Sequence, residues 1–198
     1  MTAAPRRRGA GPPPDAANLH EAALNYLARY AATEAGLRRF LERRVDRWAR
    51  LAQAEARDAD GVGHQTSEAK RVAREVAARL AAAGAVNDAT FAESKARTLT
   101  RAGRSRLAVA AYLAAKGVAA DVARSVLPED AASELAAALT VARRRRIGPF
   151  RAGAVPDPAG RRRELAILAR AGFPQSIASQ ALAIATDEAE ALVNQLRR

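Results

Sequence analysis

The chain repeats one of its own segments, and this repeat restricts the possible folds more than any other feature of the sequence. The segment LAAKGVAADVARSVL, residues 113–127, aligns with LARAGFPQSIASQAL, residues 168–182, at an offset of 55 residues. The alignment pairs Gly117 with Gly172 and Val118 with Phe173. A glycine directly after a helical stretch is typical of a helix C-terminus. The repeated unit is therefore a helix that stops at a glycine, followed by a short packing helix.

Chance is the alternative explanation of the repeat, because an alanine-rich chain aligns with itself easily. A glycine and four flanking apolar positions nevertheless coincide together, and a looser copy runs from Leu19 to about Gly84. Apolar residues spaced by three and four predict helices along the chain and no strand. We therefore expect a disordered, basic and proline-rich tail over residues 1–15, and three-helix repeats over 16–86, 87–127 and 128–198, the last with a C-terminal tail helix.

The first repeat carries an extra segment, DADGVGHQT, residues 58–66. We expect Gly61 and Gly63 to break the helical pattern there and Ser67 to begin the next helix. Asp58, Asp60 and Gly63 also match the first positions of a calcium-binding loop. The twelfth position, which needs a bidentate glutamate, is alanine. The segment therefore predicts a capped turn and no calcium site.

The net charge points to a polyanionic partner. The chain has 33 Lys and Arg against 21 Asp and Glu, a formal charge of +12, which favours nucleic acid or an acidic protein groove. It has no cysteine, as suits a reducing cytosol. The proline-rich N-terminus does not read as a signal peptide, and no apolar run is long enough to span a membrane. We expect a cytoplasmic protein without membrane contact.

Residues that carry chemistry are scattered. The two histidines, His20 and His64, lie far apart in the sequence, and neither has neighbours at metal-ligand or catalytic-triad spacing. The glycines near Gly9 and Gly61 lack the strand and the lysine-serine ending of a phosphate loop. We therefore expect no cofactor, no metal and no catalysis. An enzyme assembled from scattered polar residues is the alternative.

Arginines gather at helical spacing in two places. Four of them recur at i, i+4, i+8 and i+11 in the second predicted helix, and three recur at i, i+4 and i+7 near the middle of the chain. A solvated helix face is the alternative reading of each set. We call the two sets the first ridge, Arg39, Arg43, Arg47 and Arg50, and the second ridge, Arg97, Arg101 and Arg104.

A third basic region flanks the loop RAGAVPDPAG. Arg143, Arg144, Arg145 and Arg146 precede it, and Arg161, Arg162 and Arg163 follow it. Four successive helical residues sweep about 300° around the axis, so at least one of the first four must lie over apolar surface. The region predicts contact with phosphates or acidic side chains. Binding of stacked single-strand bases is poorly supported, because aromatic platforms are not evident.

Three blocks of the sequence resemble, in order, the regulatory protein RecX family, particularly its alphaproteobacterial members: ALNYLARYAATEAGLRRFLERRVDRWAR, LAAAGAVNDATFAESKARTLTRAGRSRLAVAAYLAAKGV and ARRRRIGPF. The resemblance implies an all-α fold, an elongated and curved array of tandem three-helix repeats. It also implies a modulator that binds in the groove of the RecA recombinase filament, blocks its growth and suppresses ATP hydrolysis and strand exchange. The insertion and the N-terminal tail depart from the family pattern.

The most specific part of the resemblance is the second block, with Gly84, Asn87, Asp88, Phe91, Ala92, Arg97, Gly103, Leu113, Lys116 and Gly117. Its helix-capping residues have a structural role as well, and we expect Phe91 in the core. The family has no sharply defined active-site motif. The predicted partner-binding or nucleic-acid-binding residues are therefore Lys116 and the basic sets Arg39, Arg43, Arg47, Arg50, Arg97, Arg101, Arg104, Arg143, Arg144, Arg145, Arg146, Arg161, Arg162 and Arg163.

The leading hypothesis is a monomeric RecA-filament regulator that contacts acidic protein surface, DNA phosphates or both. Capping of filament ends and binding along the groove both stay open. The second hypothesis is a helical protein that binds single- or double-stranded DNA, or RNA, directly. Its affinity for bare nucleic acid would fall steeply with salt.

Overall fold

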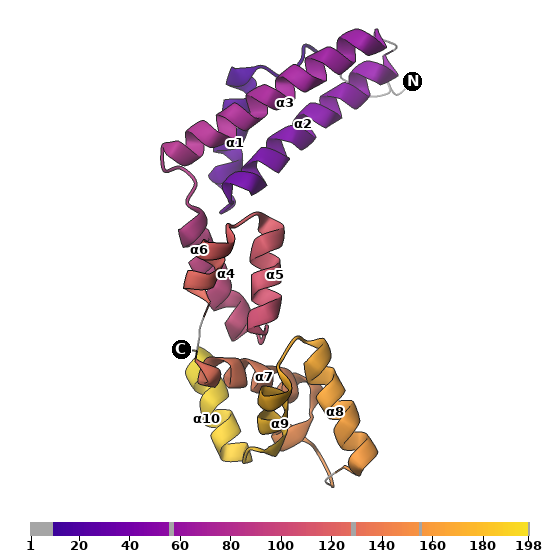
Figure 1. Cartoon of the computed structure of the whole chain (residues 1–198). Coiled ribbons are helices and arrows are strands. Elements are labelled where there is room, and N and C mark those ends of the chain that lie inside the picture. The colour runs from indigo at the N-terminus through magenta and orange to yellow at the C-terminus, as the bar shows by residue number, and fades with distance from the viewer. Residues whose placement is uncertain (1–9, 56–57, 128–129, 155, 198) are drawn as a thin grey trace, which may run out of the picture. The chain divides into compact units, whose positions relative to one another are not determined.

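The computed structural model of the chain describes residues 10–55, 58–127, 130–154 and 156–197. Over these residues the fold is all-α, as predicted, with ten α-helices, one short 3-10 helix and no strand (Figure 1). The chain divides into two compact units, residues 1–88 and 89–198.

The first unit packs three helices, α1 (Ala16–Leu27), α2 (Glu34–Ala54) and α3 (Ala59–Ala82), each against the other two. The long α2 and α3 lie side by side (Figure 1). Their shared core contains the fully buried Leu19, Leu37, Leu41, Val45 and Val76. Each such side chain contributes about 1.5–3 kcal/mol on burial, so this apolar stripe holds the unit together.

The prediction that Gly61 and Gly63 break the helix is wrong. Helix α3 begins at Ala59, because the carboxylate of Asp58 accepts a hydrogen bond of 2.7 Å from the backbone N–H of Gly61. A Cβ at Gly61 would lie 2.7 Å from Asp58 Oδ2, so the glycine permits this close cap. Val62 is buried beside Trp48, which helps to offset the low helix propensity of glycine. The histidine of this segment, His64, lies on α3 and not in a loop.

Part of the expected N-terminal tail packs on the first unit. The N–H of Ala10 donates to Glu55 Oε1 at 2.6 Å, and Trp48 Nε1 donates to the carbonyl of Gly11 at 3.3 Å. Ala10 also packs against the small cluster that contains Trp48 and Val62. Residues 10–15 therefore do not form a disordered tail, and residues 1–9 lie outside the described part of the chain.

The second unit has two hydrophobic cores. The first lies among α4 (Asp88–Arg101), α5 (Arg106–Lys116) and α6 (Ala120–Val126), and contains Phe91, as predicted. The second lies among α7 (Ala131–Arg145), the 3-10 helix η1 (Gly148–Phe150), α8 (Pro158–Arg170), α9 (Gln175–Ala183) and α10 (Thr186–Arg197). The repeat boundary predicted after Leu127 falls at residues 128–129, which lie outside the described residues.

The repeated glycine stops predicted from the sequence are confirmed. Gly117 and Gly172 both have positive φ, 86° and 89°, which favours glycine. The N–H of Val118 donates to the carbonyl of Leu113, and the N–H of Phe173 donates to that of Leu168, so both helices end in the same hydrogen-bonded turn. Val118 and Phe173 are buried after these turns. The two segments thus repeat in structure as they do in sequence.

Candidate nucleic-acid interface

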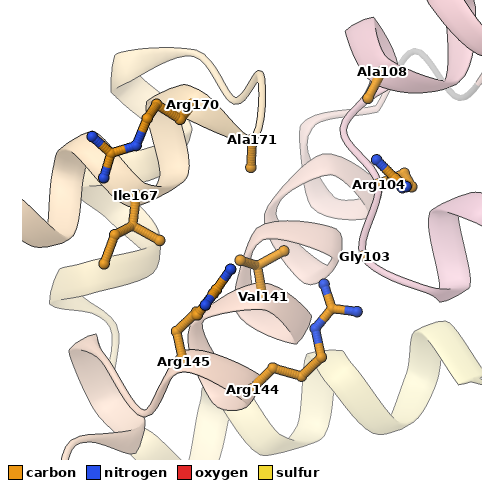
Figure 2. A pocket seen from close by; sticks show the side chains of 9 residues that line it. All are labelled: Gly103, Arg104, Ala108, Val141, Arg144, Arg145, Ile167, Arg170 and Ala171. Carbon is orange, nitrogen blue, oxygen red and sulfur yellow. The ribbon is translucent and has the colours of Figure 1, made fainter.

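Four arginines from three segments of the second unit surround one cavity of about 510 Å³. One comes from the turn between α4 and α5, two from the last turn of α7 and one from the last turn of α8. Figure 2 shows Arg144 and Arg145 at the end of α7, Arg104 on the turn opposite them, and Arg170 extending along α8 on the side of Ile167. We call this cavity the arginine pocket; its lining consists of Gly103, Arg104, Ala108, Val141, Arg144, Arg145, Ile167, Arg170 and Ala171.

The turn between α4 and α5 forms one wall of the arginine pocket because its backbone can approach α7 closely. Gly103 has a φ of 81°, and a Cβ there would lie 3.0 Å from Thr140 Cγ2 and 3.2 Å from the carbonyl oxygen of Ala137. Glycine supplies both the left-handed conformation and the space. Arg104 follows directly, so the position of its backbone is fixed by this contact.

Ser105 links the same turn to the end of α8. Its hydroxyl accepts from the N–H of Ala108, as a helix N-cap, and donates to the carbonyl oxygen of Ala171 at 2.8 Å. The serine is fully buried, and a Cβ at Gly172 would lie 2.6 Å from its oxygen. Glycine at 172 therefore serves both the helix stop and the approach of Ser105.

A carboxylate on α7 makes the third connection. The backbone N–H of Arg106 donates to both oxygens of Glu134, at 2.9 and 3.2 Å. Burial raises the pKa of the Glu134 carboxyl, while the Arg106 N–H opposes that rise. The first turn of α5 is thus held by α7 through Glu134 and by α8 through Ser105, which sets the walls of the arginine pocket before any ligand arrives.

The arginine pocket is positive without compensation from acidic side chains. No Asp or Glu lines it, and within the described part of the chain none of its four guanidinium groups forms an ion pair. The remaining lining is aliphatic, from residues such as Val141 and Ile167. Arginine stays charged at all relevant pH values and donates hydrogen bonds in a planar fork that fits phosphate. The arrangement suits an anion with several oxygens.

Arg170 is not among the predicted binding residues, although its spacing in the sequence pointed to it. It follows Arg163 by seven positions on α8, which places both on one helical face with Ile167 between them. The predicted basic region instead joined Arg161, Arg162 and Arg163 to the end of α7. Those three are exposed and do not line the arginine pocket, and Arg163 lies 4.0 Å from Asp157.

The four successive arginines at the end of α7 lie in different environments, as expected for neighbouring residues of a helix. Arg144 and Arg145 line the arginine pocket. Arg143 is half-buried, and Arg146 caps α7 with a left-handed φ of 54°.

The second ridge does not form one helical face. Arg97 and Arg101 lie on α4 and line a separate depression with Ser133 and Leu196. Arg104 lies beyond the end of α4 and lines the arginine pocket, because the helix stops before Gly103. Lys116, at the end of α5, places its Nζ 5.3 Å from the ring centre of Tyr112.

The first ridge belongs to the first unit. Arg43, Arg47 and Arg50 are exposed on α2, whereas Arg39 is half-buried. Arg47 also borders a depression with Arg44, Trp48 and the prolines that precede α1. The structure thus carries basic surface on both units.

The residues that the structure describes contain no group of three or more His, Cys, Asp or Glu that could bind a metal ion. Among the described helices, none is both long enough and apolar enough to cross a membrane.

The chain is similar in sequence to a family model and to two named proteins, and all three carry the same family name. Residues 87–127 match the family model described as RecX, second three-helix domain. The chain is similar to the protein named Regulatory protein RecX from Myxococcus xanthus (strain DK1622), with 39% identity over 166 residues and 83% of each chain covered. It is also similar to Regulatory protein RecX from Agrobacterium fabrum (strain C58 / ATCC 33970), with 36% identity over 110 residues, 56% of this chain and 58% of the relative. The chain belongs to the RecX family of regulatory proteins.

Proposed function

We propose that this chain regulates the RecA recombinase by binding the RecA–DNA filament and inhibiting filament extension, ATP hydrolysis and strand exchange. The observation that carries the proposal is its similarity, across most of its length, to a protein named Regulatory protein RecX. We propose that it acts as a cytoplasmic monomer, without a catalytic residue or a cofactor.

The basic surfaces support this proposal physically. A recombinase filament presents DNA phosphates and protein carboxylates in repeating positions, and arginine forms charge-assisted hydrogen bonds with both. The exposed arginines of the first ridge and the arginine pocket offer such contacts on each unit. Long-range attraction between a protein of charge +12 and a polyanionic filament also speeds association. The contacts need no base readout, so regulation should not depend on DNA sequence.

The experiment that tests the proposal is the single-stranded-DNA-dependent ATPase of RecA from the same organism. The protein is added well below the recombinase concentration, and its binding to bare single-stranded DNA is measured as the control. Inhibition at a ratio too low to coat the DNA is the expected result, because a filament regulator acts on many recombinase subunits at once. Unchanged ATP hydrolysis up to equimolar protein contradicts the proposal.

Direct binding of DNA or RNA is the second candidate function. The arginine pocket favours it, because four guanidinium groups without a neighbouring carboxylate suit phosphates on any nucleic acid. For this function the logarithm of the binding constant should fall linearly with the logarithm of the salt concentration. Tight, salt-sensitive binding to bare nucleic acid together with an unaffected recombinase would select this candidate.

A further inference from the structure

We infer that the arginine pocket binds a short run of phosphate groups and recognises it through the phosphates alone. The inference rests on the second candidate function and deepens it, because it names the site and the chemical group that the isolated chain recognises without any protein partner. Two sources supply this chemistry: the backbone of a nucleic-acid strand and a free linear oligophosphate. The experiment below separates them.

The arginine pocket has more hydrogen-bond donors than one phosphate group can use. Each guanidinium has five N–H donors, and four of these groups border one cavity. A single phosphate accepts only a few of these donors, so the set suits more than one phosphate. The cavity volume of about 510 Å³ lies within the range of about 300–1,000 Å³ that holds small ligands. Two or three linked phosphates match both the donors and the space.

The arginine pocket also has an unbalanced positive charge. Four like charges beside one cavity repel one another, and no carboxylate in the lining offsets them. Val141, Ile167 and Ala171 give the cavity an aliphatic surface, while the four arginines are themselves exposed, so water and salt screen part of both the repulsion and any pairing with an anion. A phosphate ligand would relieve the repulsion, and it should therefore stabilise the folded protein.

Helix-end stabilisation is the structural alternative for these arginines. A cation in the last turn of a helix interacts favourably with the helix dipole, and Arg144, Arg145 and Arg170 occupy such positions. Arg104 also stands at a helix end, because its backbone N–H donates to the carbonyl of Leu99 in the turn that closes α4. The dipole effect does not, however, require that the ends of α4, α7 and α8 face one cavity.

The lining also indicates how the ligand is recognised. None of the residues that line the arginine pocket is aromatic, so it offers no ring on which a base could stack. None of them is Asn, Gln, Asp or Glu, the side chains that commonly read adenine or cytosine edges. The arginines could read only guanine among the bases. Recognition of a guanine-free strand therefore rests on phosphate, and removing the bases from such a strand should leave its affinity unchanged.

The test uses isothermal titration calorimetry of the full chain with two probes, sodium tripolyphosphate and a short abasic single-stranded oligonucleotide. The pocket variant is Arg144→Gln with Arg170→Gln. The control variant is Arg79→Gln with Arg124→Gln, because these two arginines also lie in the last turns of helices, are exposed and do not line the arginine pocket. Both variants lose the same charge and two comparable helix-end contacts.

We expect the pocket variant to weaken binding of at least one probe by about tenfold or more, and the control variant to weaken it by less than about twofold. If the parent protein binds the abasic strand more tightly than tripolyphosphate, and the pocket variant loses that binding, the ligand is a nucleic-acid backbone. If tripolyphosphate binds more tightly, the ligand is a free oligophosphate. Equal weakening by both variants, or no binding of either probe, overturns the inference.

A second variant keeps the test valid if the double substitution alters folding. Arg104→Gln removes a single pocket charge at a residue outside the helical segments, and circular dichroism reports whether helix content is retained. It should weaken probe binding by several-fold at unchanged helix content. Full-affinity binding by a folded Arg104→Gln protein contradicts a ligand held by all four arginines.

Discussion

The hydroxyl of Ser105, before the first turn of α5, donates a hydrogen bond of 2.8 Å to the carbonyl oxygen of Ala171, at the end of α8. These residues are 66 positions apart in the chain, and the hydroxyl also caps α5 through the N–H of Ala108. One buried side chain thus completes two helix ends from different cores of the second unit.

Substitution Ser105→Ala should therefore destabilise the protein. It removes the N-cap of α5 and leaves the Ala171 carbonyl without its Ser105 donor, which together cost about 1–3 kcal/mol. The measurement is the urea midpoint of unfolding, followed by circular dichroism. The matched control is Ser125→Ala, since Ser125 is exposed and, among the described residues, its hydroxyl bonds within its own helix, to the carbonyl of Val122. Equal midpoints for the two variants would mean that the link to α8 contributes nothing.

Two glycine-to-alanine substitutions should change the free energy of unfolding in opposite directions. Gly103→Ala imposes a Cβ on a left-handed residue, 3.0 Å from Thr140 Cγ2, and should lower the free energy of unfolding by more than about 1 kcal/mol. Gly63→Ala adds a Cβ in open space on helix α3 and should raise it by about 0.5–1 kcal/mol. Thermal unfolding of both proteins checks the pair. Destabilisation by Gly63→Ala would argue against helix at that position.

Charge reversal on the first ridge should weaken inhibition of the recombinase. Arg43→Glu with Arg50→Glu replaces two exposed cations on one face of α2 by anions, and we expect the concentration for half-maximal ATPase inhibition to rise by about tenfold. The control is Arg29→Glu with Arg79→Glu, which makes the same change in charge at exposed positions of the same unit. An equal rise in both proteins would show a dependence on net charge alone.

Acidification should destabilise the second unit partly through Asp130. The backbone N–H and hydroxyl of Ser133 donate to this carboxylate and hold its pKa below the ordinary value of 3.8. A lowered folded-state pKa means that the stabilisation is present above about pH 3.8 and is lost as the pH falls through the lower folded value. Glu134, whose pKa is raised by burial, acts in the opposite direction.

The measurement is the urea midpoint at several pH values between neutral and strongly acidic. Asp130→Asn keeps a good N-cap residue but removes the titration, so its midpoint should fall less on acidification than that of the parent. Asp121→Asn serves as the control, because within the described residues the Asp121 carboxylate accepts no hydrogen bond. An Asp130→Asn protein as acid-sensitive as the parent contradicts the assigned role.

The local signals in the sequence predicted much of the fold. The stops at Gly117 and Gly172 and the core position of Phe91 depend on residues close in the chain, and the structure confirms them. The start of α3 was missed because two glycines outweighed the capping potential of Asp58. That cap, together with burial of Val62, is enough to keep the glycines helical.

The arginine pocket could be predicted only in part, because it is assembled from distant segments. Arg104, Arg144 and Arg145 were selected for their charge and spacing, but the contact that joins their segments depends on the size of residue 103 and on the Ser105 hydroxyl. Arg170 lies apart from the dense basic run before it, and its helical spacing from Arg163 is the one signal that points to it. Helical periodicity describes one helix at a time and carries no information on which helix ends share a cavity.

The bond between the Arg106 N–H and Glu134 has a consequence for how the protein can be divided. The family model covers residues 87–127, whereas Glu134, Thr140 and Ala171, which hold the turn after α4, lie beyond that range. A fragment cut after Leu127 would keep its own apolar core but lose every one of these anchors. The matched three-helix domain is therefore held partly by residues outside its own boundaries, so a deletion made after Leu127 should also destabilise the helices that remain.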